Sequence, residues 1–112
     1  MKVCRTLEFD RDLKKLTKKF LSLPDDLEIF IKVQLLLYHH HQLDNHGIFP
    51  IPGYPQLFKA KKIACKSLKG RGAQSGLRII YRYIPSTVTF IEVYFKADSE
   101  NPNFERLKEY KG

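Results

Sequence analysis

The sequence predicts an α+β domain in which a helical hairpin packs on one face of a small antiparallel sheet of three to four strands. Two observations lead to this prediction. Apolar residues recur at helical spacing over residues 9–38, and they alternate at strand spacing over residues 57–96. With 112 residues, 43% of them hydrophobic, the chain has the size and apolar content of one domain spanning residues 1–112.

A short N-terminal strand and two helices are expected in the first half. Residues 1–8 alternate and suit an edge strand, and apolar residues at spacings of four, three and four then predict an amphipathic helix: Phe9, Leu13, Leu16 and Phe20. Ser22, Pro24 and Asp25 form a helix start. The second helix is expected to be the most buried element, with an apolar stripe of Leu27, Phe30, Ile31, Leu35 and Tyr38 widened by Ile29, Val33, Leu36 and Leu37.

Three consecutive histidines, His39, His40 and His41, close this helical region. Neighbouring helical residues point about 100° apart, so three in a row do not converge on one ion. Histidines in a last turn also suit the negative end of the helix dipole. We therefore expect no metal site and no cofactor.

The second half predicts strands. Residues 48–55, with three prolines and a glycine, are expected to be a loop, and residues 69–76 a glycine-rich turn. Strands are expected over residues 57–68, 77–84 and 87–96, and a short helix over 103–110, opened by Asn101 and Pro102.

Positive charge is concentrated in one stretch. Residues 59–82 hold eight of the 20 Lys and Arg residues and no Asp or Glu, so the formal net charge of +8 arises there. A field of one sign attracts polyanions, of which nucleic acid is the commonest.

Strand alternation places much of this charge on one sheet face. The apolar sets are expected to face the helices: Ile63, Cys65, Leu77, Ile79, Tyr81, Ile91, Val93 and Phe95. In the last strand, Phe90 is expected on the face opposite Ile91, Val93 and Phe95. The outward face then collects Lys62, Lys66, Arg78, Arg82, Glu92, Tyr94 and Lys96. Cations, one carboxylate and an aromatic ring on one surface indicate a functional face.

The sequence lacks the motifs that mark several other classes of protein. The glycines at 70, 72 and 76 precede a strand and lack the GK[ST] ending of a P-loop, and no HExxH or GxSxG motif occurs. No apolar run has the length of a signal peptide or a membrane span. Cys4 and Cys65 form no CxxC pair and are expected to be reduced thiols in a cytoplasmic protein.

Two segments resemble the RelE/ParE/HigB superfamily, the toxins of prokaryotic type II toxin–antitoxin modules. They are the Gly-x-Arg-apolar-apolar-Tyr strand at residues 76–81, preceded by basic residues, and the segment FIEVYFK at residues 90–96. The order of elements also resembles this superfamily over nearly the whole chain.

The resemblance to RelE implies a metal-independent endoribonuclease, an mRNA interferase that cuts messenger RNA in the ribosomal A site and inhibits translation. It places the family's basic strand residues on Lys62, Lys66 and Arg78, and a basic residue at the end of the last strand on Lys96. RelE has a tyrosine early in its C-terminal helix region, where this chain has Phe104, which stacks but donates no proton. The implied partner is a small acidic antitoxin that masks the basic face.

The residue types fit this chemistry. Metal-free RNA cleavage needs a deprotonated 2′-hydroxyl, stabilisation of the phosphorane and a protonated leaving oxygen. Arg78 suits a bidentate phosphate contact, and a lysine among cations has a lowered pKa, which makes Lys62 or Lys66 a candidate base with Glu92 as the rival. RNA contacts are expected from Lys69, Arg71, Arg82, Tyr94 and Phe104.

Two other functions remain open at this point. ParE-like members of the same superfamily inhibit DNA gyrase without cleaving nucleic acid. A basic RNA-binding module without catalysis is the other, and a steep salt dependence of binding without cleaved product would distinguish it.

Overall fold

The computed structural model describes residues 1–40, 47–68 and 75–111. It is a compact α+β domain with a radius of gyration of 13.1 Å. Strand β1 (Lys2–Arg5) leads into helix α1 (Leu7–Thr17), and a second helical segment follows as α2 (Leu23–Phe30), a π-helical turn η1 (Ile31–Leu35) and α3 (Leu36–His39). Four strands come next: β2 (Ile48–Ile51), β3 (Tyr54–Ala60), β4 (Leu77–Ile84) and β5 (Thr87–Phe95). The chain ends in α4 (Phe104–Leu107) and the 3₁₀ turn η2 (Lys108–Tyr110).

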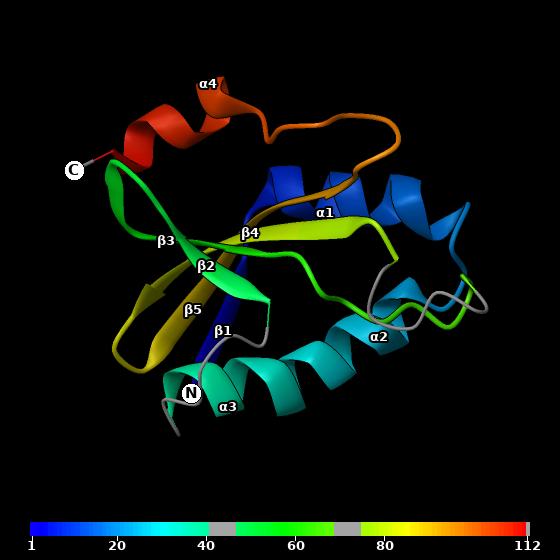
Figure 1. Cartoon of the computed structure of the whole chain (residues 1–112), viewed down its shortest axis with the longest axis horizontal. Coiled ribbons are helices and arrows are strands. Elements are labelled where there is room, and N and C mark those ends of the chain that lie inside the picture. Colours follow the sequence, from blue (N-terminus) through cyan, green and yellow to red (C-terminus); the bar gives the residue numbers. More distant parts are fainter. Residues whose placement is uncertain (41–46, 69–74, 112) are drawn as a thin grey trace.

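The sheet has five strands in the order β1-β5-β4-β3-β2. In the view of Figure 1, α1 lies above the strands and α2–α3 lie below them. The expected antiparallel sheet of three to four strands is therefore corrected in two ways. β1 pairs in parallel with β5, with Lys2 opposite Thr87, so the sheet is mixed. The expected loop at residues 48–55 contains β2, which pairs antiparallel with β3 at the edge of the sheet. Proline is tolerated on an edge strand because the ladder does not need its missing N–H on the open side.

The helical layer follows from the apolar spacing. Phe9, Leu13, Leu16 and Phe20 are all buried, as predicted, and the Thr6 side chain caps α1 by accepting a hydrogen bond from Phe9 N. In the second helical segment, Leu27, Phe30 and Leu35 are buried, but Ile29 and Val33 are exposed, so the widened stripe was wrong at these two positions. Regular helical spacing accounts for both exposures, because Ile29 and Val33 come two and six positions after Leu27 and so lie on the far side of the helix from it.

The sheet buries both of its faces. The face toward α1 and α2 forms the main core, with Ile79, Tyr81, Phe90 and Val93 among its sheet residues. The opposite face, called the outer face below, carries a smaller cluster of Leu57, Ile80, Ile91, Tyr94 and Leu107. The C-terminal α4–η2 segment covers part of this face, and Figure 1 shows it beside the end of the β2–β3 hairpin.

A bulge in the β4–β5 ladder reverses part of the expected alternation. Ile80 pairs with Glu92, but the next residue, Tyr81, pairs with Phe90, so Ile91 is the extra residue. Phe90 consequently faces the helices, 5.2 Å from Phe9 ring to ring, and Ile91 belongs to the outer cluster. The prediction had placed both residues on the wrong faces, because a bulge shifts the period of two by one residue.

The predicted strand over residues 57–68 ends early, at Ala60. The segment from Lys61 to Leu68 crosses to the start of α2 instead, where the Ser67 backbone N–H and side-chain hydroxyl both donate to Ser22 Oγ at 2.8 Å. The Lys66 N–H donates to the buried carboxylate of Asp26. Side-chain acceptors therefore hold this segment in place of a strand partner.

Candidate RNA-binding face and active site

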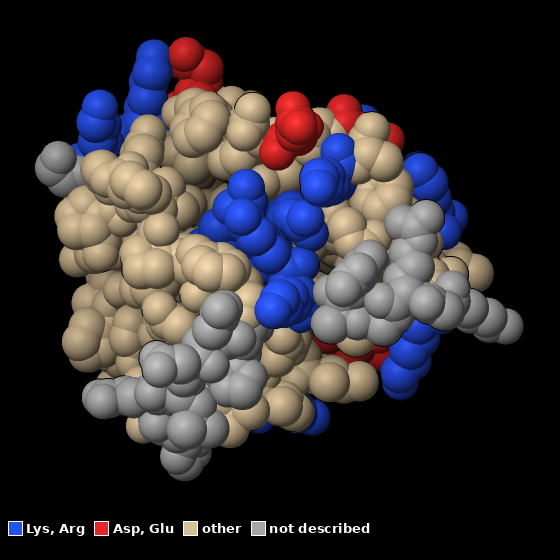
Figure 2. All heavy atoms as spheres, viewed as in Figure 1, with Lys and Arg blue, Asp and Glu red and all other residues tan. Residues whose placement is uncertain are grey.

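Four cations gather on the outer face of the sheet: Lys59 in β3, Lys61 just after it, Arg78 in β4 and Lys96 just after β5. We call them the four-cation cluster. Figure 2 shows blue basic side chains gathered in the middle of this face. Lys59 is half-buried, and burial lowers its pKa, as do the charges of Lys61, Arg78 and Lys96 in that order. The four charges are therefore close enough to act on one another and on one bound anion.

Arg78 is held by the backbone. Its Nη1 donates to the carbonyl oxygen of Lys61 at 3.0 Å and to that of Leu77 at 3.2 Å. Among the described residues these bonds involve Nη1 alone, although a guanidinium has five N–H donors. The group is thus oriented by the protein while retaining donors for a phosphate.

Gly76 links the start of β4 to Lys96. Its φ of 87° lies in the left-handed region, which glycine adopts without the cost that a side chain adds. Its carbonyl oxygen accepts a hydrogen bond from Lys96 N at 2.8 Å. The glycine of the Gly-x-Arg strand therefore places Lys96 opposite the start of β4, close to Arg78.

Lys62 and Lys66 do not occupy the strand positions expected of them. Both are exposed on the segment that follows β3, and the backbone of Lys66 is fixed at Asp26 near the start of α2. The sequence argument for a lysine with a lowered pKa among other cations applies to Lys59 instead. Lys59 was missed because a strand continuing to residue 68 would put it on the same face as Ile63 and Cys65, toward the helices. The strand ends at Ala60 instead, and Lys59 pairs with Ile80 on the outer face.

Glu92 is on the outer face, as expected, but it is buried. Its carboxylate accepts the N–H of Asn103 at 2.9 Å and 3.2 Å. Burial raises its pKa, against the effects of that N–H and of Arg106. Glu92 therefore anchors the C-terminal segment on the sheet. This contact differs from the open position expected of a base that takes a proton from RNA.

Arg82 and Tyr94 were expected to contact RNA, but neither side chain is fully open to solvent. Arg82 lies 5.5 Å from the ring centroid of Tyr110, and Tyr94 is 7% exposed, with burial raising its pKa to about 12. Arg82 Nε and the Tyr94 hydroxyl are buried with no hydrogen-bond partner among the described residues. Phe104, by contrast, is 49% exposed at the start of α4. Lys69 and Arg71 lie outside the described residues.

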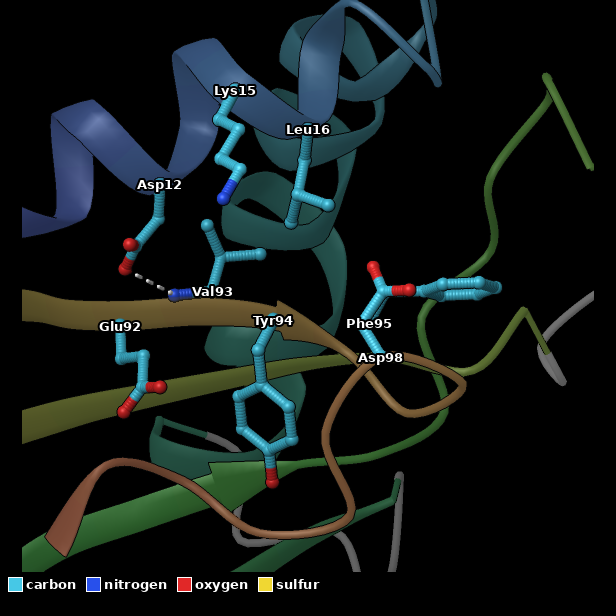
Figure 3. Close-up of a pocket in the computed structure, with 8 residues that line it drawn as sticks. All are labelled: Asp12, Lys15, Leu16, Glu92, Val93, Tyr94, Phe95 and Asp98. Carbon is cyan, nitrogen blue, oxygen red and sulfur yellow. Dashed lines mark hydrogen bonds between the residues drawn. The ribbon is translucent and has the colours of Figure 1, made fainter.

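Two pockets lie near these groups, and their charges differ. The first, of about 170 Å³, lies between α1 and the end of β5 and is lined by Asp12, Glu92 and Asp98 with one cation, Lys15. Figure 3 shows Lys15 and Leu16 reaching down from α1, and the Tyr94 ring leaving β5 on the other side. The second, of about 230 Å³, lies on the outer face and includes Lys59 and Lys61 with no acidic residue among its described lining. The second pocket suits a polyanion and the first does not.

The sequence analysis also made predictions about the cysteines, the histidines and membrane-spanning helices. Cys4 and Cys65 are free. His39 accepts or donates a hydrogen bond at 2.7 Å with the Tyr81 hydroxyl and stacks on Tyr83, while His41 lies outside the described residues. No helix within the described ranges is long and apolar enough to cross a membrane.

No protein-family model, curated protein or solved structure matches the chain. The site itself carries what bears on function: an oriented arginine, a lysine with a lowered pKa, two further cations and an exposed aromatic ring on one sheet face.

His39 makes a testable contribution to stability. Burial, and secondarily the charge of His40, lower its pKa from 6.5 to about 4. Between these values the unfolded chain binds the proton and the folded chain does not, so stability falls as the pH falls from 6.5 to 4. Because the ring is half-buried and solvent screens it, we expect about 1–2 kcal/mol rather than the full effect. Urea unfolding of wild type and His39→Gln across this range measures it, and a constant difference between the two proteins would contradict the assignment.

Proposed function

We propose that this chain is a RelE-like toxin of a type II toxin–antitoxin module, a metal-independent endoribonuclease that cuts messenger RNA in the ribosomal A site. The observation that carries the proposal is the four-cation cluster, in which half-buried Lys59 has a lowered pKa beside the backbone-held Arg78. The order of strand, two helices, antiparallel strands and short C-terminal helix supports it, because the resemblance implies that order. The proposed setting is the cytoplasm.

The groups have distinct roles in the proposed reaction. Neutral Lys59 takes the proton of the 2′-hydroxyl, whose oxygen attacks the phosphorus, while the bond to the 5′-oxygen breaks and that oxygen takes a proton from water. Burial together with three neighbouring cations favours the neutral form of Lys59. Arg78 and Lys96 stabilise the extra negative charge of the phosphorane. Phe104 stacks on an unpaired base and so helps to orient the message. Glu92 has no role in the proposed scheme, because its carboxylate is buried and accepts the N–H of Asn103.

The proposed protein partner is an acidic antitoxin. The four-cation cluster supplies the opposite charge on a face that the antitoxin would need to mask. Charge complementarity of this kind speeds association and selects partners.

The test is primer extension on a translated message, with purified protein added to a bacterial translation extract and, in parallel, to naked RNA. We expect cuts on ribosome-bound message that fall at least about 100-fold with Arg78→Ala, the effect of removing one donor to a developing oxyanion. Arg11→Ala is the matched control, because Arg11 is an exposed arginine on α1. Full activity of folded Arg78→Ala would contradict the proposed site.

Cuts on naked RNA as well would retain the nuclease and remove the requirement for the ribosome. Absence of cuts in either reaction would favour the two other functions. Gyrase inhibition would then appear in a supercoiling assay, and simple RNA binding as a steep loss of affinity with salt.

A further inference from the structure

The pocket on the outer face contains the two exposed phenylalanines of the chain. All eight Phe residues lie in described segments, and only Phe49 and Phe104 among them are exposed, at 38% and 49%. They come from β2 and α4, 55 positions apart in the sequence, and both line this one pocket. The exposed parts of these two rings gain no burial free energy in the unliganded protein, so their convergence indicates a ligand that covers them.

The walls of this Phe49–Phe104 pocket are preformed. Pro50 and Pro52 line it from the β2 side and Pro102 from the C-terminal side, and proline restricts the backbone. The C-terminal wall is tied to the sheet by the hydrogen bonds from Asn103 N to the Glu92 carboxylate. A pocket that is already shaped loses less free energy in ordering when a ligand binds.

The charge of the pocket defines the ligand further. Lys59 pairs directly across from Phe49, and Lys61 Nζ lies 5.2 Å from the Phe49 ring centroid. Both lysines line the pocket and also belong to the four-cation cluster. The ligand should therefore join a flat apolar ring to an anionic group a few ångströms away, which is the chemistry of a nucleotide.

The size of the pocket limits how much of the ligand enters. Its volume of about 230 Å³ is below the roughly 300–1,000 Å³ typical of sites for drug-sized molecules. This suits one ring system and not two stacked bases. Asn101 also lines the pocket, and its amide both donates and accepts hydrogen bonds, as needed to read the edge of a base.

We propose that the Phe49–Phe104 pocket holds one unpaired nucleobase of single-stranded RNA while Lys61 binds the adjoining phosphate. The inference rests on the proposed function for the choice of RNA, and it adds a base-binding subsite formed by β2. That subsite places a base beside the four-cation cluster and makes the pocket a determinant of which sequence is cut.

The test uses the DNA trinucleotide dApdApdA, which lacks the 2′-hydroxyl needed for the proposed cleavage. Binding is followed by NMR of protein carrying ¹³C-labelled phenylalanine rings. The resonances of Phe49 and Phe104 are expected to shift, while those of the six other phenylalanines stay in place. Inorganic phosphate, the second probe, is expected to cause no comparable ring shifts because it has no base to stack.

Two variants and a control make the test quantitative. Phe49→Leu and Phe104→Leu are each expected to weaken trinucleotide binding about 5- to 150-fold, the equivalent of one lost base–aromatic stack. Val33→Ala is the control, because Val33 is 48% exposed on the helical layer and outside the pocket. Unchanged affinity in both Leu variants, or ring shifts spread over the buried phenylalanines, would overturn the inference.

The two proposals fail separately. Cleavage that depends on Arg78 but is insensitive to both Leu variants would retain the nuclease and remove the base pocket. Trinucleotide binding at Phe49 and Phe104 by a protein that cuts no RNA would establish the pocket and remove the nuclease.

Discussion

Lys59→Met is expected to lower the single-turnover cleavage rate of ribosome-bound message by about 10²–10⁴-fold, the usual contribution of a general base. The reason is the lowered pKa of Lys59, which burial and three neighbouring cations produce. Since a base acts in its deprotonated form, the wild-type rate should rise with pH and level off below pH 10.5, the ordinary value for lysine. Met removes the proton acceptor while keeping a side chain of similar length.

Lys59→Arg separates the charge of the side chain from its basicity. Arginine keeps a cation for phosphate binding but does not lose its proton at neutral pH. We expect RNA binding near that of wild type together with cleavage as slow as in Lys59→Met. Lys14→Met, an exposed lysine on α1, is the control and should cleave at the wild-type rate. Full cleavage by Lys59→Arg would show that Lys59 acts through its charge alone.

Phe90→Ala is expected to lower the free energy of unfolding by about 3–5 kcal/mol. Phe90 is fully buried, stacks on Phe9 at 5.2 Å and meets the Tyr81 ring edge-on at 6.1 Å. Alanine would leave a cavity between the sheet and α1. Urea unfolding should show a lower midpoint at an unchanged slope if the native state stays compact.

Phe49→Ala provides the matched comparison, because it removes the same ring from a site that is 38% exposed. We expect a loss of about 0.5–1 kcal/mol there. Simple alternation along β5 would place Phe90 on the outer face and predict a much smaller difference between the two variants. Equal losses would contradict the bulge between Ile80 and Tyr81.

The helices and the central strands could be predicted because their periods are regular. Phe9, Leu13, Leu16 and Phe20 repeat at helical spacing over about three turns. Both β4 and β5 were expected within one residue of their observed bounds. Where the period is interrupted by a local feature, the prediction was wrong. The bulge beside Ile91 shifts the buried face of β5, and no residue marks it in the sequence.

The positive charge of the candidate site could be predicted from the sequence, but only some of its residues could. Arg78 and Lys96 lie in the four-cation cluster, as the strand pattern indicated. Lys59 and Phe49 were missed because two prolines concealed β2, and because residues 61–68 imitate a strand while being held by Ser22 and Asp26. Those hydrogen bonds join residues 40 and 45 positions apart, and no local pattern encodes them.

The parallel pairing of β1 with β5 has a consequence for synthesis. The first strand finds its partner only when Thr87–Phe90 have been made, and Thr6 N then donates to Phe90 O to close the start of α1 against the sheet. A contact between the two ends of a chain forms late, because the intervening loop must first be closed. The nascent chain thus completes its fold, and with it the cation-bearing sheet, only after Thr87–Phe90 have left the ribosome. Until then the proposed toxin cannot act on the ribosome that makes it.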